Sequence, residues 1–229
     1  MYANPNAALV ASLVSEASRA AILTVLLDGR YHPASELAYM AKIKPQTASF
    51  HLSKMVAANL VTVEQQGRHR YYGIQDQEVA QVMETLLSIT PPVEIRSLNQ
   101  ATETEAIRQA RTCYDHLAGN LGIQLTNSLL SAGVISEVED QYMVTEKGEN
   151  FFKEFQIDLS RVKRQRRSFA YRCLDWSERR HHLAGALGHA LLERLLELHW
   201  IQRVPRTRAI QITPEGKEGL KETFHIDME

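Results

Sequence analysis

The chain has 229 residues, of which 44% are hydrophobic, and its formal net charge is −1. This composition is typical of a globular protein with a real core. Two cysteines are too few for a disulfide scaffold, and no apolar run of about 18 residues predicts a transmembrane helix. The first residues lack the basic and apolar regions of a signal peptide, so we expect a cytoplasmic protein without membrane contact.

Residues 33–74 have the order of a short helix, a tight turn, a second helix and a basic hairpin. Ser35 can cap the first helix, and Pro45 suits the first turn of the second helix because proline has no N–H to lose. Alternation over residues 61–65 predicts a half-buried strand, and Gln66-Gly67 predicts the turn after it. This order is that of a helix-turn-helix with a wing, whose second helix enters the DNA major groove.

The second helix has two different faces. Ala48, Leu52 and Met55 repeat at three- and four-residue spacing and should face the core. The opposite face carries side chains that can bond base edges or touch the thymine methyl, and the basic residues of the hairpin suit phosphate or a narrow minor groove. The predicted DNA-binding residues are Lys44, Gln46, Thr47, Ser49, Phe50, His51, Ser53, Lys54, Arg68, His69 and Arg70.

Charge supports this interpretation. Residues 30–73 hold six lysines and arginines against two acidic residues, a net of +4, whereas the whole chain carries −1. A local basic patch on a nearly neutral protein is an electrostatic footprint for nucleic acid. Many winged helices bind protein instead, and the charge argues against that alternative here.

Four short motifs together resemble the ArsR/SmtB group of bacterial winged-helix repressors: Glu16–Leu23, Ser35–Ala38, Ser49–Leu52 and Gly67–Tyr72. The resemblance covers about residues 5–90 and implies a homodimer that binds an inverted repeat and leaves DNA when a signal arrives. The usual metal sites of the group are absent, because the helix before the turn has no cysteine and no histidine follows Asp76 through residue 89.

Residues 75–89 predict an amphipathic helix that ends before the prolines at 91 and 92. In the resembled group the first and last helices of the module pair across the dimer, which would bury Leu9, Leu86 and their apolar neighbours. Alternatively, these residues cover the C-terminal part of the same chain. We place a DNA-binding and dimerisation domain at residues 1–92.

Residues 93–229 contain an internal repeat, with copies at about 100–157 and 160–229. His116-Leu-Ala-Gly recurs as His182-Leu-Ala-Gly, each after a Cys-x-Asp and before a helical run and a Thr-x-x-Gly. Each copy predicts helix, helix, short strand, turn and strand, a degenerate winged helix without a basic recognition face. The predicted fold class is mainly α with short β-hairpins (α+β), with this pair of repeats as an effector domain around a pseudo-twofold interface.

The basic run at residues 161–167 lies between the copies. It could grip DNA phosphates, form a solvated helix face, or dock on the acidic surface of residues 137–158. The sequence leaves these alternatives open.

The recurring cysteine, aspartate and histidine positions are candidates for signal reception. Cysteine and histidine with a carboxylate are competent ligands for a divalent metal such as zinc. Thiol oxidation, a small organic ligand in the crevice between the copies, and a purely structural role remain alternatives, since aspartate caps helices and free cysteine is often a small buried hydrophobe. The candidate effector or metal residues are Cys113, Tyr114, Asp115, His116, Arg172, Cys173, Asp175, Trp176, His181 and His182.

These patterns predict a DNA-binding transcriptional regulator that acts on double-stranded operator DNA. By the resemblance it would be a homodimeric repressor, released by a signal that the C-terminal domain senses. The alternative is a protein-interaction module built from winged-helix scaffolds. An enzyme is not expected, because no nucleophile motif with a recognisable base is present.

Overall fold

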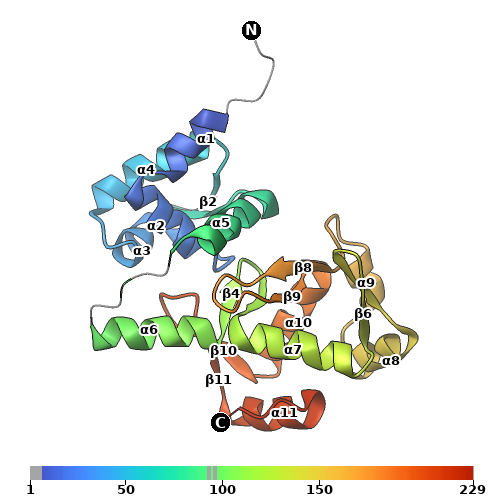
Figure 1. The fold of residues 1–229 in the computed structure, drawn as a ribbon. Helices are drawn as coiled ribbons and strands as arrows, with labels where there is room; N and C mark the ends of the chain where they lie inside the picture. The colour runs from blue at the N-terminus through green and yellow to red at the C-terminus, as the bar shows by residue number, and fades with distance from the viewer. Residues whose placement is uncertain (1–6, 92–93, 95–96, 229) are drawn as a thin grey trace. The chain divides into compact units, whose positions relative to one another are not determined.

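The computed structural model describes residues 7–91, 94 and 97–228. The chain forms two compact units, residues 1–84 and 85–229, which divide inside helix α5 (Gln77–Ile89) (Figure 1). The domain boundary predicted after residue 92 falls on residues outside the described part and stays a prediction.

The N-terminal unit is a winged helix-turn-helix. Its three strands form one antiparallel sheet in the order β1-β3-β2. Leu23, Leu37, Leu52 and Met55, from three different helices, are fully buried and form its core. The elements before α5 are α1 (Ala7–Val14), α2 (Ala17–Leu26), β1 (His32–Pro33), α3 (Ala34–Met40), α4 (Pro45–Ala57), β2 (Val61–Gln66) and β3 (His69–Ile74).

Local sequence signals explain most element boundaries of this unit. Helix α4 begins at Pro45 as predicted, where the missing N–H is not needed. Gly67 turns the β2–β3 hairpin with a φ of 60°, a conformation that glycine adopts without steric cost. Helix α3 begins at Ala34 without a side-chain cap, so the prediction of Ser35 as its N-cap is wrong.

The C-terminal unit continues with fourteen elements, among the residues that the structure describes. A four-stranded antiparallel sheet in the order β6-β7-β8-β9 joins the two halves of the unit. The elements are α6 (Leu98–Gln109), β4 (Arg111–Cys113), β5 (His116–Ala118), α7 (Gly119–Ser131), β6 (Ile135–Val138), β7 (Gln141–Val144), α8 (Glu146–Glu154), α9 (Leu159–Lys163), β8 (Tyr171–Leu174), β9 (His181–Ala184), α10 (Gly185–Glu197), β10 (Ile201–Arg203), β11 (Ile210–Ile212) and α11 (Pro214–Phe224).

Both halves repeat one order of elements: hairpin, helix, hairpin, helix. The predicted order of helix, helix, strand, turn and strand is present, but an additional hairpin precedes the long helix in each half (β4–β5 and β8–β9). These two hairpins carry the repeated cysteines and histidines. Thr145 and Thr213 cap α8 and α11 in the same way, each accepting the N–H of the glycine three residues later.

The two halves pack crosswise. Helix α7 lies against β9, and helix α10 lies against β5, so each long helix contacts the hairpin of the other half. A Cβ at Gly122 would lie 3.8 Å from the Cβ of His182, and one at Gly188 would lie 3.2 Å from the Cβ of His116. This reciprocal packing is compatible with the pseudo-twofold arrangement that the repeat predicts, and it brings the two histidines together.

Among the described residues, no single helix has the length and apolar character to cross a membrane. Helices α1 and α2 have the required length and apolar character only when they are taken together, and the chain bends by 89° between them.

Candidate DNA-binding surface and cysteine-histidine cluster

The outward face of α4 is polar and exposed. Gln46, Ser49, Phe50, Ser53 and Lys54 are all exposed on it, and Phe50 retains 56% of its surface. The Lys54 ammonium lies 4.3 Å from the centre of the Phe50 ring. Lys44, at the start of the helix, is also exposed, and Thr47 is half-buried. The helix therefore offers hydrogen-bonding groups, one aromatic ring and positive charge to a groove.

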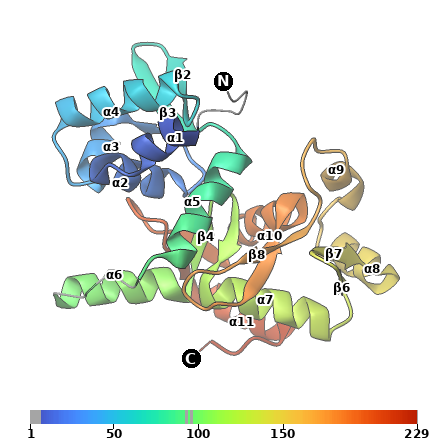
Figure 2. The ribbon, with the colours of Figure 1, turned by 45° about the horizontal axis from the view of Figure 1, so that its top comes forward.

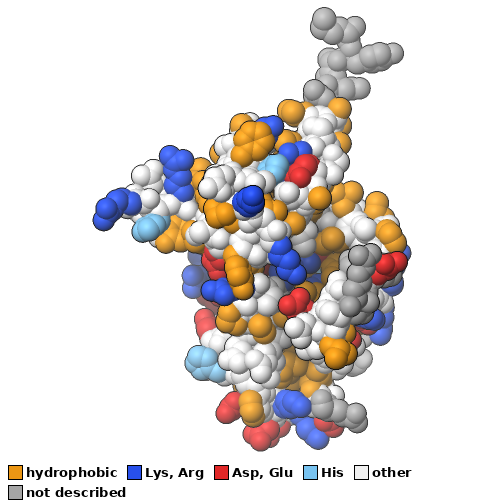
Figure 3. Space-filling model, turned by 90° about the vertical axis from the view of Figure 1, so that its left-hand side faces the viewer, with side chains coloured by type: hydrophobic (Ala, Val, Ile, Leu, Met, Phe, Trp, Pro, Cys, Tyr) orange, Lys and Arg blue, Asp and Glu red, His pale blue; other side chains and the backbone are white. Residues whose placement is uncertain are grey.

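The wing adds positive charge beside this face. Arg68, His69 and Arg70 are all exposed at the turn of the β2–β3 hairpin, where Gln66 pairs with His69. Figure 2 shows this hairpin standing out from the N-terminal unit. Figure 3 shows lysine, arginine and histidine side chains gathered at the end of a projecting arm of that unit. Guanidinium groups placed in this way can reach phosphates without a folding rearrangement.

His51 does not belong to this surface. It is 7% exposed, its Nδ1 lies 3.3 Å from an Arg19 guanidinium nitrogen, and its Nε2 lies 3.5 Å from a Glu16 carboxylate oxygen. The prediction of His51 as a DNA contact is therefore wrong, because its side chain packs against α2 and its preceding loop. Its role is to tie the recognition helix to the rest of the unit.

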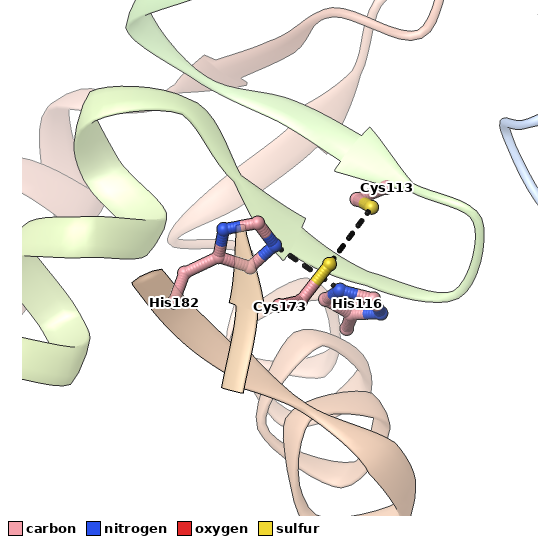
Figure 4. Close-up of side chains that lie close together, drawn as sticks. All are labelled: Cys113, His116, Cys173 and His182. Atoms are coloured by element: carbon pink, nitrogen blue, oxygen red, sulfur yellow. Dashed lines mark hydrogen bonds between the residues drawn. The ribbon is translucent and has the colours of Figure 1, made fainter. Parts of the chain in front are cut away.

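In the C-terminal unit, the structure brings four predicted effector residues together. The sulfur atoms of Cys113 and Cys173 lie 3.8 Å apart, and the Nε2 atoms of His116 and His182 lie 3.2 Å apart (Figure 4). One ligand atom from each residue lies within 4.8 Å of all the others. Cys113, His116 and His182 are buried, Cys173 is half-buried, and no disulfide joins the two cysteines.

An aspartate lies near the Nδ1 atom of each histidine. Asp115 lies 3.4 Å from Nδ1 of His116, and Asp175 lies 3.7 Å from Nδ1 of His182. Each aspartate is held in turn by an arginine. Arg167 forms an ion pair with Asp115. Arg111 donates a hydrogen bond of 2.8 Å to Asp175, and the side chains of Arg111 and Asp175 are fully buried.

The charges of the cluster are strongly perturbed. Burial works against protonation of His116, but the neighbouring Cys113 and Asp115 outweigh it and raise the pKa of His116 to about 10. Burial and the charge of His116 hold the pKa of His182 well below its ordinary value. The two rings are therefore held in contrasting electrostatic environments although their Nε2 atoms lie only 3.2 Å apart.

Asp175 has a second task in the same place. Its carboxylate accepts the backbone N–H of Gly119 at 2.7 Å, at the start of α7 in the other half of the unit. It also accepts the N–H groups of Ser177 and Glu178. Helix capping by aspartate was one of the structural alternatives open from the sequence. Asp175 serves the first turn of α7 across the repeat interface, which the sequence could not indicate.

Four predicted effector residues lie outside the cluster. Tyr114 is in the turn of the β4–β5 hairpin with a φ of 59°. Trp176 packs its ring 4.3 Å from the Arg111 guanidinium carbon. Arg172 donates toward His181 at 3.1 Å, and His181 is exposed on β9 while its neighbour His182 is buried. These residues lie on or directly beside the hairpins that carry the cluster.

Sequence reasoning missed the two arginines that complete the site. Arg111 is fully buried, yet nothing in its local pattern distinguishes it from a surface residue. Arg167 belongs to the basic run at 161–167, and the structure uses it to bind Asp115, while Lys163 of the same run lies 3.6 Å from Glu149. A surface hollow of about 570 Å³ is lined by α8, α9 and the loop between them, with Glu149 and Lys163 among its lining residues.

A polar recognition helix beside a basic wing defines the winged helix-turn-helix class of DNA-binding proteins. A family model described as a helix-turn-helix domain matches residues 14–64. Over 223 residues, 97% of this chain and 99% of the relative, the sequence is 51% identical to the uncharacterized HTH-type transcriptional regulator YdfF of Bacillus subtilis. The chain therefore belongs to the HTH-type transcriptional regulators, and it is a DNA-binding regulator, as the ArsR-type motifs imply.

Solved structures give partial matches. NolR from Sinorhizobium fredii is 24% identical over an alignment that covers 41% of this chain and 100% of the NolR chain, with a TM-score of 0.35. The cadmium metal-sensor CMTR from Mycobacterium tuberculosis is 27% identical over 39% of this chain and 99% of its own, with a TM-score of 0.32. HlyU from Vibrio cholerae is 24% identical over 35% of this chain and 86% of its own, with a TM-score of 0.33.

Proposed function

We propose that the protein is a cytoplasmic, homodimeric repressor that binds an inverted-repeat operator and leaves it when the C-terminal unit receives a signal. The observation that carries the DNA-binding part is the exposed polar face of α4 beside the exposed Arg68 and Arg70. Repression and release by a signal follow from the ArsR-type resemblance of the N-terminal motifs. The role is that of a regulator and not of an enzyme.

The two parts of the surface would do different work. Lys44, Arg68 and Arg70 fix the position of the protein by contacting phosphates, which carry no sequence information. Gln46 can bond both adenine N6 and N7, and the exposed Phe50 ring can touch a thymine methyl. Specificity therefore lies on α4, whereas much of the affinity lies on the wing.

Replacing Gln46 with alanine tests whether α4 recognises base edges in the major groove. We expect Gln46→Ala to cost about 1–3 kcal/mol at one base pair of the preferred site and to relax the preference there. The measurement is selection of duplexes from a random pool by the wild-type and variant full chains, followed by titration of the selected sequences. Gln75→Ala, at an exposed glutamine outside α4, is the matched control. An unchanged base preference at every position would contradict the assignment.

Exposed apolar side chains on α1 and α5 support dimerisation. Leu9 and Val10 on α1 are 53% and 37% exposed, and Val82, Leu86 and Ile89 on α5 are 52%, 38% and 74% exposed. Large apolar side chains repeated along one helix are costly to leave in water and mark association surfaces. In the ArsR/SmtB group the corresponding helices pair across the dimer.

Introducing a charge into this surface should separate the dimer. We expect Leu86→Glu to place an unpaired carboxylate in an apolar seam, which disfavours association strongly. Sedimentation velocity of the full chain should then report a monomer at concentrations where the wild type is dimeric. Val138→Glu, which changes a 52% exposed valine on β6, should leave the dimer intact. An intact Leu86→Glu dimer would place the interface elsewhere.

A protein-interaction module remains the second candidate function. The local charge of +4 over residues 30–73 favours DNA. Salt separates the two candidates, because DNA affinity falls steeply with ionic strength as phosphates release their counterions. Titrations of a selected duplex between low and moderate salt should give a steep linear slope of log affinity against log salt. A flat slope would favour the protein-interaction module.

A further inference from the structure

We propose that Cys113, His116, Cys173 and His182 bind one zinc ion per chain, and that this ion joins the two halves of the C-terminal unit. The inference goes beyond the proposed function, since it concerns the C-terminal unit alone and holds whether or not DNA is bound. It rests on the geometry, burial and chemistry of the four side chains.

The spacing of the ligand atoms fits a tetrahedral ion. With Zn–S bonds of about 2.3 Å and Zn–N bonds of about 2.0–2.1 Å, tetrahedral angles separate two sulfurs by about 3.8 Å and two nitrogens by about 3.3 Å. The observed separations are 3.8 Å between the sulfurs and 3.2 Å between the Nε2 atoms. Two independent edges of the tetrahedron are therefore already in place.

The ligand set indicates zinc rather than magnesium or calcium. Two thiolates and two imidazoles are soft or borderline donors, which select zinc over hard cations that prefer oxygen. Two thiolates would also neutralise the charge of a divalent ion at a place where three of the four residues are buried. Four protein ligands complete the coordination sphere, as in structural zinc sites, and leave no open position for a reacting water.

The surroundings of the histidines support the same conclusion. Each ring turns Nε2 toward the centre of the cluster and has an aspartate near Nδ1, at 3.4 Å for His116 and 3.7 Å for His182. The second ring nitrogen of a zinc-bound histidine usually donates its N–H hydrogen bond to a carboxylate, which fixes the ring orientation. Nδ1 of His182 has no hydrogen-bond partner within the described residues, and its ring is fully buried beside Asp175.

The topology explains why such an ion would matter for the fold. One cysteine and one histidine come from the β4–β5 hairpin, and the other pair comes from the β8–β9 hairpin. A Cβ at Gly188 would lie 3.2 Å from the Cβ of His116, closer than an ordinary contact, so glycine at this position leaves room for the opposite histidine. An ion at the centre would therefore cross-link segments that lie about sixty residues apart in the sequence.

Cobalt is the probe, because tetrahedral Co²⁺ replaces Zn²⁺ and reports its ligands by visible absorption. The reduced, metal-free full chain is titrated with Co²⁺ and then with Zn²⁺. We expect one Co²⁺ per chain, intense tetrahedral d–d bands, a near-ultraviolet thiolate charge-transfer band, and loss of all bands on Zn²⁺ addition. Mg²⁺ should not compete. Zn²⁺ should also raise the melting temperature of the chain, because it binds the folded state.

Four variants make the test specific. Cys113→Ser and Cys173→Ser should each lower the charge-transfer intensity, because one thiolate ligand remains, and His182→Ala should weaken Co²⁺ binding by at least a hundredfold. His181→Ala removes the exposed neighbour on the same strand and should bind Co²⁺ like the wild type. Circular dichroism checks that each variant folds, and for one that does not, the wild-type spectrum still decides between thiolate and non-thiolate ligands.

Two results would overturn the proposal. The first is a reduced, folded wild-type chain that takes up no Co²⁺, or takes it up without a thiolate band. The second is Co²⁺ binding that His182→Ala and His181→Ala diminish equally. A Cys113–Cys173 disulfide formed on oxidation, in a protein that shows the first result, would assign the cluster to thiol chemistry instead.

Discussion

Replacing Arg111 with methionine is expected to lower the free energy of unfolding of the C-terminal unit by about 3–5 kcal/mol. Both Arg111 and Asp175 are fully buried, and their hydrogen bond is 2.8 Å long. Arg111 also donates to Ser177 Oγ and lies over the Trp176 ring. Methionine fills part of the volume, but it leaves the Asp175 carboxylate buried without its counter-charge, and that is the costly step.

The size of this effect should depend on pH. Burial alone would raise the pKa of Asp175, but Arg111, Ser177 and the N–H of Gly119 outweigh it and hold the pKa below its ordinary value. A carboxylate with a lowered pKa in the folded state stabilises the fold above the pKa of the unfolded chain, about 3.9, and loses that contribution as the pH falls through the folded-state pKa. The difference between wild type and Arg111→Met should therefore be largest near neutral pH and shrink in acid.

Tryptophan fluorescence in urea measures this effect selectively. The two tryptophans of the chain, Trp176 and Trp200, both lie in the C-terminal unit, so their signal follows that unit. Arg108→Met is the matched control, because the Arg108 side chain is 50% exposed and its ion pair with Glu178 is 3.7 Å long. Such a surface pair contributes at most about 1 kcal/mol. Equal losses of unfolding free energy in the two variants would show that the buried Arg111–Asp175 pair stabilises the unit no more than an exposed ion pair does.

The N-terminal unit was accessible from the sequence because its signals are local. Pro45 marks the first turn of α4 and Gly67 marks the wing turn, and the structure has both where they were expected. His51 was misassigned although the local signal was present. It lies three residues after Ala48 and four before Met55, so helical spacing places it on the buried side of α4, where it contacts Arg19.

Local sequence signals do not predict every short strand or the long-range ion pairs of the C-terminal unit. Strands β4 and β5 have three residues each, which is too short for alternation to be recognised, so the β4–β5 hairpin was not predicted. The repeat nevertheless indicated that matching cysteines and histidines could converge, because duplicated segments tend to pair. The contacts of Arg111 with Asp175 and of Arg167 with Asp115 join distant segments, and no local pattern predicts such pairs.

Removing the two wing arginines together should have the largest effect on DNA binding. Each lost phosphate contact lowers the slope of log affinity against log salt by about 0.9, so Arg68→Ala/Arg70→Ala should lose about 1.8 per bound chain. The same relation predicts a loss of affinity of about 30-fold per bound chain near 0.15 M salt. Because phosphates are common to all sequences, a selected duplex and an unrelated duplex of equal length should lose affinity by similar factors.

The control must remove the same charge elsewhere. Arg161 and Arg166 are exposed in the basic run between the repeats, so Arg161→Ala/Arg166→Ala changes the net charge equally without touching the wing. Fluorescence anisotropy over a salt series should show an unchanged slope for this variant and the reduced slope for the wing variant. Equal reductions in both would mean that overall charge, and not contact by Arg68 and Arg70, determines the affinity. A wing variant with the wild-type slope would place the DNA-binding surface outside the β2–β3 hairpin.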